Sequence, residues 1–154
     1  MISIAFILLA GGIAMYLHTR TKCVACALSF LLTLGLLRPS IITALLQYSC
    51  CFLIAMAGIL LLPKREHKYL TYSMYFFILG AVTQFFDFYT TPILTFGLPM
   101  LALLLINQQE DPQLSAKQMF RLSGRGFAGW FAGYILMWIG KLSLTTIFTE
   151  YNAL

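Results

Sequence analysis

The chain has 154 residues, of which 60% are hydrophobic and only 10% are charged, and its mean hydropathy is +0.86. A soluble domain carries about 25% charged residues, so this composition excludes an ordinary soluble protein and predicts an integral membrane protein. The net charge of +5 does not indicate a nucleic-acid partner, because the basic residues fall in short segments between apolar runs. In such segments they are typical determinants of membrane topology and contacts for anionic lipid headgroups.

The apolar runs predict an all-α, polytopic bundle of about six transmembrane helices in a single domain over residues 1–154. These runs cover residues 1–17, 23–37, 41–62, 69–86, 92–106 and 127–148. The first run lacks the basic start and cleavage site of a secretory signal, so we expect it to be a retained span. The first two runs are short for a hydrocarbon core of about 30 Å, which predicts tilt or local thinning.

The fifth run leaves two interpretations open. It is short and contains Gly97 and Pro99, so it is either a kinked span or a re-entrant hairpin. Residues 107–126 form the only long polar loop. Its apolar positions indicate an interfacial amphipathic helix inside that loop: Leu114, Met119, Phe120 and Leu122.

The distribution of basic residues favours the spanning interpretation. If the fifth run spans, the other side of the membrane receives Arg38 alone among the loops, and one side receives eight basic residues: Arg20, Lys22, Lys64, Arg65, Lys68, Lys117, Arg121 and Arg125. The positive-inside rule then places these eight in the cytoplasm. Both termini and the junction after the fourth run are then predicted to lie outside.

The last run contains Gly129 and Gly133. Their G-x-x-x-G spacing indicates close packing against another helix, and we expect this face to offer a site for a protein partner.

The four cysteines fall into two pairs. Cys23 and Cys26 have the C-x-x-C spacing of redox and metal sites, although helix packing is the more ordinary explanation. Cys50 and Cys51 are adjacent and cannot face one site, which indicates packing. The sequence predicts no cofactor, metal cluster, nucleophilic triad or glycine-rich phosphate loop.

Asp87 carries the strongest functional signal, because it is the only acidic residue inside or at the edge of an apolar run. A carboxylate at membrane depth costs about 2.5–3.5 kcal/mol on insertion scales and usually faces a partner or water. Lys141 lies about two-thirds along the last run, at a similar predicted depth. We expect the two side chains to pair or to share an outer, water-filled pocket. A purely structural ion pair, or a lysine that extends to the interface, is the alternative.

Other polar groups are predicted near the same face. Candidate substrate-binding residues are Gln84, Tyr89, Thr90, Thr91 and Arg38, with Thr95 close by. Arg38 is expected outside, where it is available to a phosphate. Packing, helix capping or membrane anchoring would also explain each of these residues.

Two segments resemble known proteins. Residues 80–99, GAVTQFFDFYTTPILTFGLP, and residues 131–144, FAGYILMWIGKLSL, are similar to segments of polytopic membrane proteins from Gram-positive bacteria. Those proteins look like the membrane parts of envelope-glycan or lipid-linked sugar enzymes, and the matched segments make up about a fifth to a quarter of the chain. Asp87 and Lys141 are the charged members of the two segments.

The resemblance extends to C-type glycosyltransferases, which use a polyprenyl-phosphate sugar and keep an acid at the outer membrane face. This chain departs from them, since it lacks their large outer loop and has fewer spans. The resemblance therefore implies a shortened relative, a fragment or a subunit.

These observations predict a membrane protein of envelope polysaccharide or lipid-linked glycan metabolism and leave open whether it is an enzyme. Asp87 would be the acid or substrate-orienting group, and Lys141 its partner or a phosphate contact. The alternatives are a small transporter or flippase-like carrier, and a structural subunit of a larger membrane complex.

Overall fold

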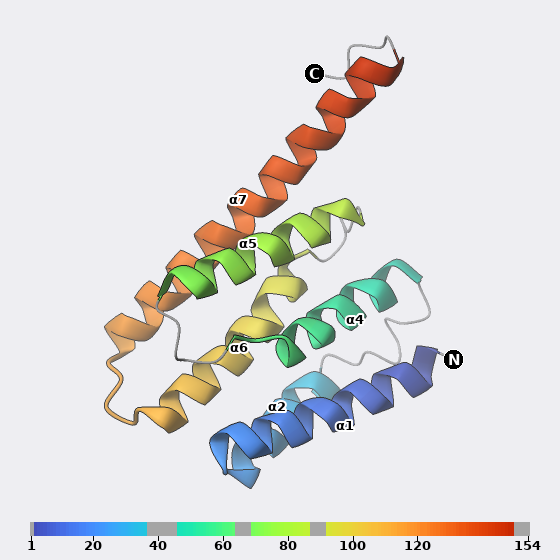
Figure 1. The fold of residues 1–154 in the computed structure, drawn as a ribbon. Coiled ribbons are helices and arrows are strands. Elements are labelled where there is room, and N and C mark those ends of the chain that lie inside the picture. The colour runs from blue at the N-terminus through green and yellow to red at the C-terminus, as the bar shows by residue number, and fades with distance from the viewer. Residues whose placement is uncertain (1, 37–45, 64–68, 87–91, 150–154) are drawn as a thin grey trace.

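The computed structural model describes residues 2–36, 46–63, 69–86 and 92–149. Within these ranges the chain is all-α, as predicted, and contains no strand (Figure 1). Its six helices are α1 (Ile2–Thr21), α2 (Val24–Leu36), α4 (Leu46–Leu60), α5 (Tyr69–Phe85), α6 (Ile93–Glu110) and α7 (Ala116–Thr149).

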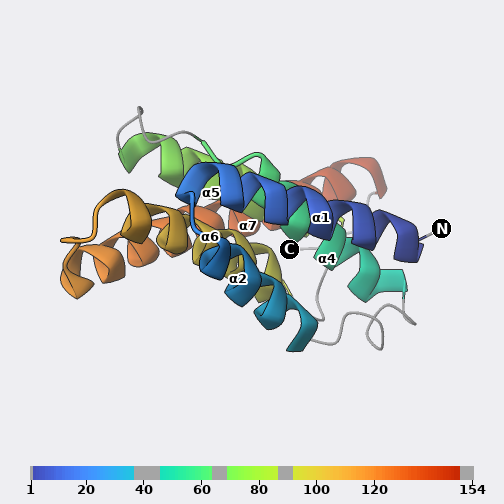
Figure 2. The same ribbon diagram turned by 90° about the horizontal axis from the view of Figure 1, so that it is seen from below.

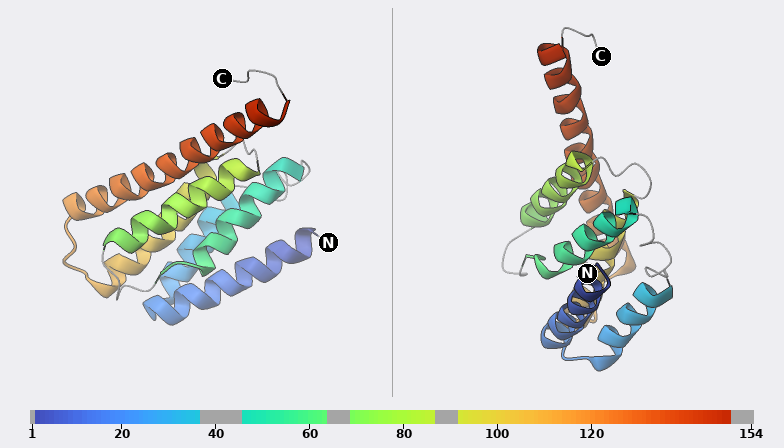
Figure 3. Two further views of the ribbon diagram at one scale, coloured as in Figure 1. Left: turned by 45° about the horizontal axis from the view of Figure 1, so that its top comes forward. Right: turned by 90° about the vertical axis from the view of Figure 1, so that its right-hand side faces the viewer.

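Consecutive helices in this series run in opposite directions along the bundle (Figures 1 and 3). The start of α1 and the end of α7 therefore lie toward the same end of the molecule. Helices α1 and α2 lie on one side and α5 and α7 on the other, with α4 and α6 between them (Figure 1), so α1 and α2 are nearest the viewer when the molecule is seen from below (Figure 2). This arrangement fits a chain that crosses a membrane repeatedly.

Among the described residues, three helical segments are long and apolar enough to cross a membrane: Ile4–Thr21, Ile93–Glu110 and Ala116–Phe148. Val24–Leu36 and Cys50–Leu60 are shorter apolar helices. Large apolar side chains also point away from the bundle, as Ile7 and Met15 of α1 do at 71% and 72% exposure. Helices that are apolar on their outer face as well as their inner face are typical of a lipid environment.

Helix α6 is the centre of the bundle, because it contacts α1, α4, α5 and α7. Its inward side chains, such as Leu98, Leu103 and Ile106, are almost completely buried. Pro99 lies inside α6 without dividing it, so the fifth run is one continuous helix and not a hairpin. Proline is tolerated in an apolar helix where neighbouring helices pack around the backbone groups that it leaves without a partner.

Helix boundaries differ from the prediction at the end of the bundle where α6 meets α7. The long polar loop predicted over residues 107–126 is wrong, because α6 continues to Glu110 and α7 already begins at Ala116; the helix expected inside this stretch is present from Ala116 on and is continuous with the last apolar run. Ser115 caps α7: its backbone N–H donates to Gln118 Oε1 at 2.9 Å, and its carbonyl accepts the Gln118 N–H at 2.9 Å. Between this cap and the apolar run no proline intervenes, so one helix of 34 residues forms.

Helix α7 is longer than the hydrocarbon core of a membrane is thick. At about 1.5 Å per residue, 34 residues extend for about 50 Å, whereas a hydrocarbon core is about 30 Å thick. The last turns of α7 project beyond the other helices (Figure 1).

Helices α5 and α7 pack closely along glycines. A Cβ at Gly80 would overlap the carbonyl oxygen of Trp130, and a Cβ at Gly133 would overlap that of Phe77. A Cβ at Gly129 would lie 2.6 Å from the Ser73 carbonyl oxygen. We call Gly80, Gly129 and Gly133 the glycine seam.

The close packing predicted from the G-x-x-x-G spacing is therefore present, and its partner is α5 of the same chain. The face formed by Gly129 and Gly133 is not available to a separate protein while α5 covers it.

Candidate functional site at the end of α5

Three buried polar side chains join α5, α6 and α7. Thr83 Oγ1 and Thr95 Oγ1 are 2.7 Å apart, and the Trp130 indole N–H donates to Thr95 Oγ1 at 3.1 Å. Thr83 and Thr95 are both completely buried. Buried polar groups in an apolar core are costly unless they are hydrogen-bonded, so this polar cluster fixes how the three helices meet.

The two threonine hydroxyls make three contacts that each need a hydroxyl proton: the Thr83–Thr95 contact and one contact from each hydroxyl to a carbonyl oxygen. Thr83 Oγ1 lies 2.7 Å from the Leu79 carbonyl oxygen, and Thr95 Oγ1 lies 2.8 Å from that of Pro92. Each hydroxyl donates only one hydrogen bond. The Thr83–Thr95 bond therefore competes with one of these two carbonyls, and the indole N–H is the one donor with a single acceptor in this group.

Replacing Trp130 with phenylalanine removes that donor and keeps most of the ring packing. We expect the variant to lose about 0.6–1.7 kcal/mol of unfolding free energy, which lies between the average and the largest measured value for interhelical hydrogen bonds in a membrane protein. Denaturant unfolding in detergent micelles measures this loss. Trp138→Phe is the control, because Trp138 is 42% exposed on the same helix; equal losses in the two variants would contradict the role of the Thr95 bond.

Lys141 of α7 contacts the last carbonyls of α5. Its Nζ donates to the Phe85 oxygen at 2.9 Å and to the Gln84 oxygen at 3.2 Å, and it lies 5.9 Å from the centre of the Phe85 ring. The last four carbonyls of a helix lack intrahelical donors and carry the negative end of the helix dipole. An ammonium group from a neighbouring helix satisfies them and is held in place by them.

Two of the predicted site residues are thus brought together. Lys141 is bonded to the backbone of Gln84, whose side chain is completely buried at the end of α5. The remaining predicted site residues lie outside the described residues: Asp87, Tyr89, Thr90, Thr91 and Arg38.

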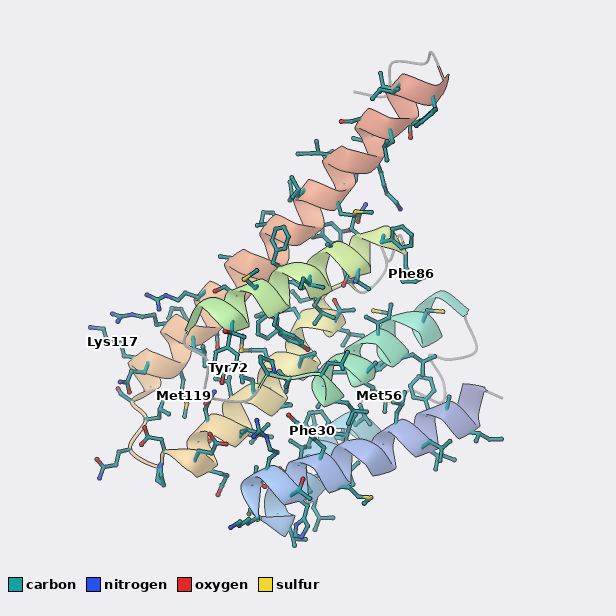
Figure 4. All side chains as sticks on the ribbon, in the orientation of Figure 1. Phe30, Met56, Tyr72, Phe86, Lys117 and Met119 are labelled. Carbon is teal, nitrogen blue, oxygen red and sulfur yellow. The ribbon has the colours of Figure 1, made fainter. Side chains whose placement is uncertain are left out.

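The candidate site and the start of α7, which carries Lys117, lie at opposite ends of the molecule. Figure 4 shows Phe86 at the end of α5 that approaches the candidate site, and Lys117 at the far end of the bundle, near the start of α7. The positive-inside rule requires such a separation if the candidate site faces outside.

An apolar groove lies along another face of α5. It has a volume of about 280 Å³ and runs between α4 and α5. The Tyr75 hydroxyl spans the same helix pair, since it donates to the Gly58 carbonyl at 2.7 Å. The lining residues are otherwise apolar: Ile54, Ala57, Gly58, Leu61, Ile78, Leu79 and Val82.

Sequence reasoning missed two features of this site. From the sequence, Trp130 is explained equally well as an interface or packing aromatic, although an indole N–H usually finds an acceptor when it is buried. The contact of Lys141 with backbone carbonyls was also missed. A backbone acceptor leaves no mark in the sequence, so only the position of α7 reveals it.

Comparison of the chain with models of protein families, with curated proteins and with solved structures finds no match.

Proposed function

We propose that this chain is a bacterial cytoplasmic-membrane protein that binds and processes a lipid-linked glycan precursor at the end of α5. Asp87 is the acid or substrate-orienting group, and Lys141 is its partner or the contact for a lipid phosphate. The observation that carries the proposal is the pair of hydrogen bonds from Lys141 Nζ to the Gln84 and Phe85 carbonyls.

Those bonds hold a positive charge two residues before Asp87 in the chain. Two residues extend by at most about 7 Å, so the chain length permits the Asp87 carboxylate to approach the ammonium group. An ammonium carries three N–H donors, and contact with two carbonyls is compatible with an additional anionic neighbour. A phosphate oxygen or a carboxylate would form a charge-assisted hydrogen bond there.

The apolar groove between α4 and α5 supports the lipid part of the proposal. Its volume of about 280 Å³ is near the lower end of the range of ligand pockets, so it suits a segment of a hydrocarbon chain. Val82 at the groove lies two residues before Gln84 along α5. A substrate with an apolar tail in the groove and a phosphate near Lys141 would contact both surfaces of one helix.

Binding to a polyprenyl phosphate in nanodiscs tests this proposal, with the neutral polyprenol as the matched ligand. We expect the wild-type chain to prefer the phosphate, and Lys141→Gln to weaken its binding about tenfold, the equivalent of one lost charge-assisted bond. Lys117→Gln at the other end of the bundle is the control and should bind as wild type does. Equal affinity for phosphate and alcohol would overturn the phosphate contact, and an unchanged lipid-linked sugar pool in a deletion strain would overturn the wider proposal.

A small carrier is the second candidate. It is favoured by the buried polar cluster of Thr83, Thr95 and Trp130, which links three helices inside the bundle. Uptake or lipid translocation in proteoliposomes separates a carrier from the first candidate, because a processing protein leaves the distribution of the lipid across the bilayer unchanged.

The proposed orientation places both termini outside and the basic loops, with their anionic lipid contacts, inside. An alkaline phosphatase fused after Leu154 should therefore be active in intact cells, whereas a green fluorescent protein at the same position should stay dark. If instead the fluorescent protein fusion is bright and the phosphatase fusion is inactive, the proposed orientation is wrong and the candidate site lies in the cytoplasm.

A further inference from the structure

The turn between α1 and α2 places one cysteine directly before a helix. Lys22 has the left-handed φ of 51°, and its N–H donates to the His18 carbonyl at 2.8 Å, which ends α1. The Cys23 N–H then donates to Thr21 Oγ1 at 3.3 Å. These contacts fix Cys23 at the position just before Val24, the first residue of α2.

Cys23 and Cys26 contact each other across the first turn of α2. The two thiols are close enough to affect each other's ionisation, and the backbone N–H groups of Cys26 and Ala25 lie near the Cys23 sulfur and favour its thiolate. Cys23 is partly exposed, whereas Cys26 is buried and its side chain also reaches Gln109 of α6. The more accessible thiol is thus at the helix start, and the second is directly beneath it.

The electrostatics of this turn favour the thiolate of Cys23. The backbone N–H of Cys26 is the main cause that lowers the pKa of the Cys23 thiol below its ordinary value, and the Cys26 thiol contributes next. Thiolates are the nucleophiles in disulfide exchange, and lowered pKa values are typical of cysteines at helix starts.

The spacing also permits a disulfide. Residues three apart in a helix have Cα atoms about 5 Å apart, which lies inside the range of about 4.4–6.8 Å that disulfides require. Cys50 and Cys51, by contrast, are neighbours whose side chains point in different directions on α4.

We propose that Cys23 and Cys26 form a reversible dithiol–disulfide pair that exchanges with low-molecular-weight disulfides. The Cys23 thiolate attacks one sulfur of a disulfide R–S–S–R, its S–S bond breaks, and one thiolate leaves and takes up a proton. The Cys26 thiol then loses its proton and attacks the Cys23 sulfur of the mixed disulfide, and the second thiolate leaves. The two protein thiols are oxidised by two electrons, and R–S–S–R is reduced to two R–SH.

This site is independent of the proposed glycan function, because it lies at the opposite end of the bundle from Lys141. Forming the disulfide moves the Cys26 sulfur toward Cys23, and this sulfur lies close to the Gln109 side chain of α6. The exchange therefore links the redox state of the surroundings to the packing between α2 and α6.

Oxidised glutathione is the probe for the full-length chain in nanodiscs. We expect the wild-type protein to lose two thiols, and peptide mapping to show a cross-link between Cys23 and Cys26. The Cys26→Ser variant should stop at one glutathione on Cys23, and Cys23→Ser should take up none at Cys26. The Cys50→Ser/Cys51→Ser double variant is the matched control and should still form the cross-link.

Alkylation at neutral pH gives a second measurement that does not depend on the oxidant. Cys23 should react at least about threefold faster than Cys50, because both thiols are partly exposed and the start of α2 favours the Cys23 thiolate. Equal alkylation rates for Cys23 and Cys50, no glutathione adduct in Cys26→Ser, or a cross-link lost in the Cys50→Ser/Cys51→Ser variant would each overturn the proposal.

Discussion

Replacing Gly80 with alanine is expected to push α5 away from α7 and to lower the unfolding free energy by about 1–3 kcal/mol, the usual cost of overpacking. The added Cβ would overlap the carbonyl oxygen of Trp130. A backbone atom cannot rotate aside as a side chain can, so one of the two helices must move. Gly133→Ala should behave in the same way against the Phe77 carbonyl.

The movement of α5 away from α7 should also disturb the candidate site. Lys141 lies eight residues after Gly133 on α7, and its contacts with Gln84 and Phe85 depend on the distance between the two helices. We therefore expect Gly80→Ala to weaken polyprenyl-phosphate binding as well as stability. A variant that loses stability but keeps wild-type binding would show that the seam and the site are uncoupled.

Gly140→Ala is the matched control for the seam. It lies on the same helix, and a Cβ there would meet no atom within 4 Å. Alanine in a helix interior is favoured over glycine by about 0.5–1 kcal/mol, so this variant should be as stable as wild type or slightly more stable. Both variants are compared by unfolding in one detergent; equal effects at Gly80 and Gly140 would contradict the close contact between α5 and α7.

The glycine seam also shows what the sequence could and could not predict. The spacing of Gly129 and Gly133 indicates a close helix contact, because small residues at four-residue intervals share one face. It does not identify the second helix. That helix is α5 of the same chain, and its contribution comes from Gly80 and from the carbonyls of Ser73 and Phe77, which carry no sequence pattern.

Helix ends were predicted less well than helix cores, for a physical reason. Hydropathy marks where a chain is apolar, but a helix continues into polar residues as long as its hydrogen bonds and caps are satisfied. Residues 107–110 and 116–126 are polar on average and are nevertheless helical. The Ser115 cap and the buried side chain of Leu122 explain the early start of α7.

The candidate site was predicted in part. A lysine in an apolar run signals a buried partner, and the structure places Lys141 at the end of the helix that precedes Asp87. The hydrogen bond of Trp130 to Thr95 spans 35 residues of sequence. Several threonines lie at similar depths, so nothing in the sequence selects the one that accepts the indole proton.

Removing both charges of the predicted pair should cost less unfolding free energy than the two single removals cost together. Lys141→Met leaves the Gln84 and Phe85 carbonyls without this donor. If the proposed pair forms, each single variant also leaves the other charge without its partner. An unbalanced charge at membrane depth is costly, so we expect the Asp87→Asn/Lys141→Met double variant to be more stable than the sum of the single losses predicts, by about 1–3 kcal/mol.

A charge swap distinguishes the proposed ion pair from the contact between Lys141 and the end of α5. The Asp87→Lys/Lys141→Asp variant restores opposite charges but sets a carboxylate against the negative end of α5, where Lys141 now donates to two carbonyls. We expect the swap to be less stable than the neutral Asp87→Asn/Lys141→Met variant and to lose polyprenyl-phosphate binding. Unfolding in detergent measures the first difference. Single-variant losses that add to within about 0.5 kcal/mol would show that the two residues do not interact, and a fully stable swap would show that the α5 carbonyls do not hold the lysine in place.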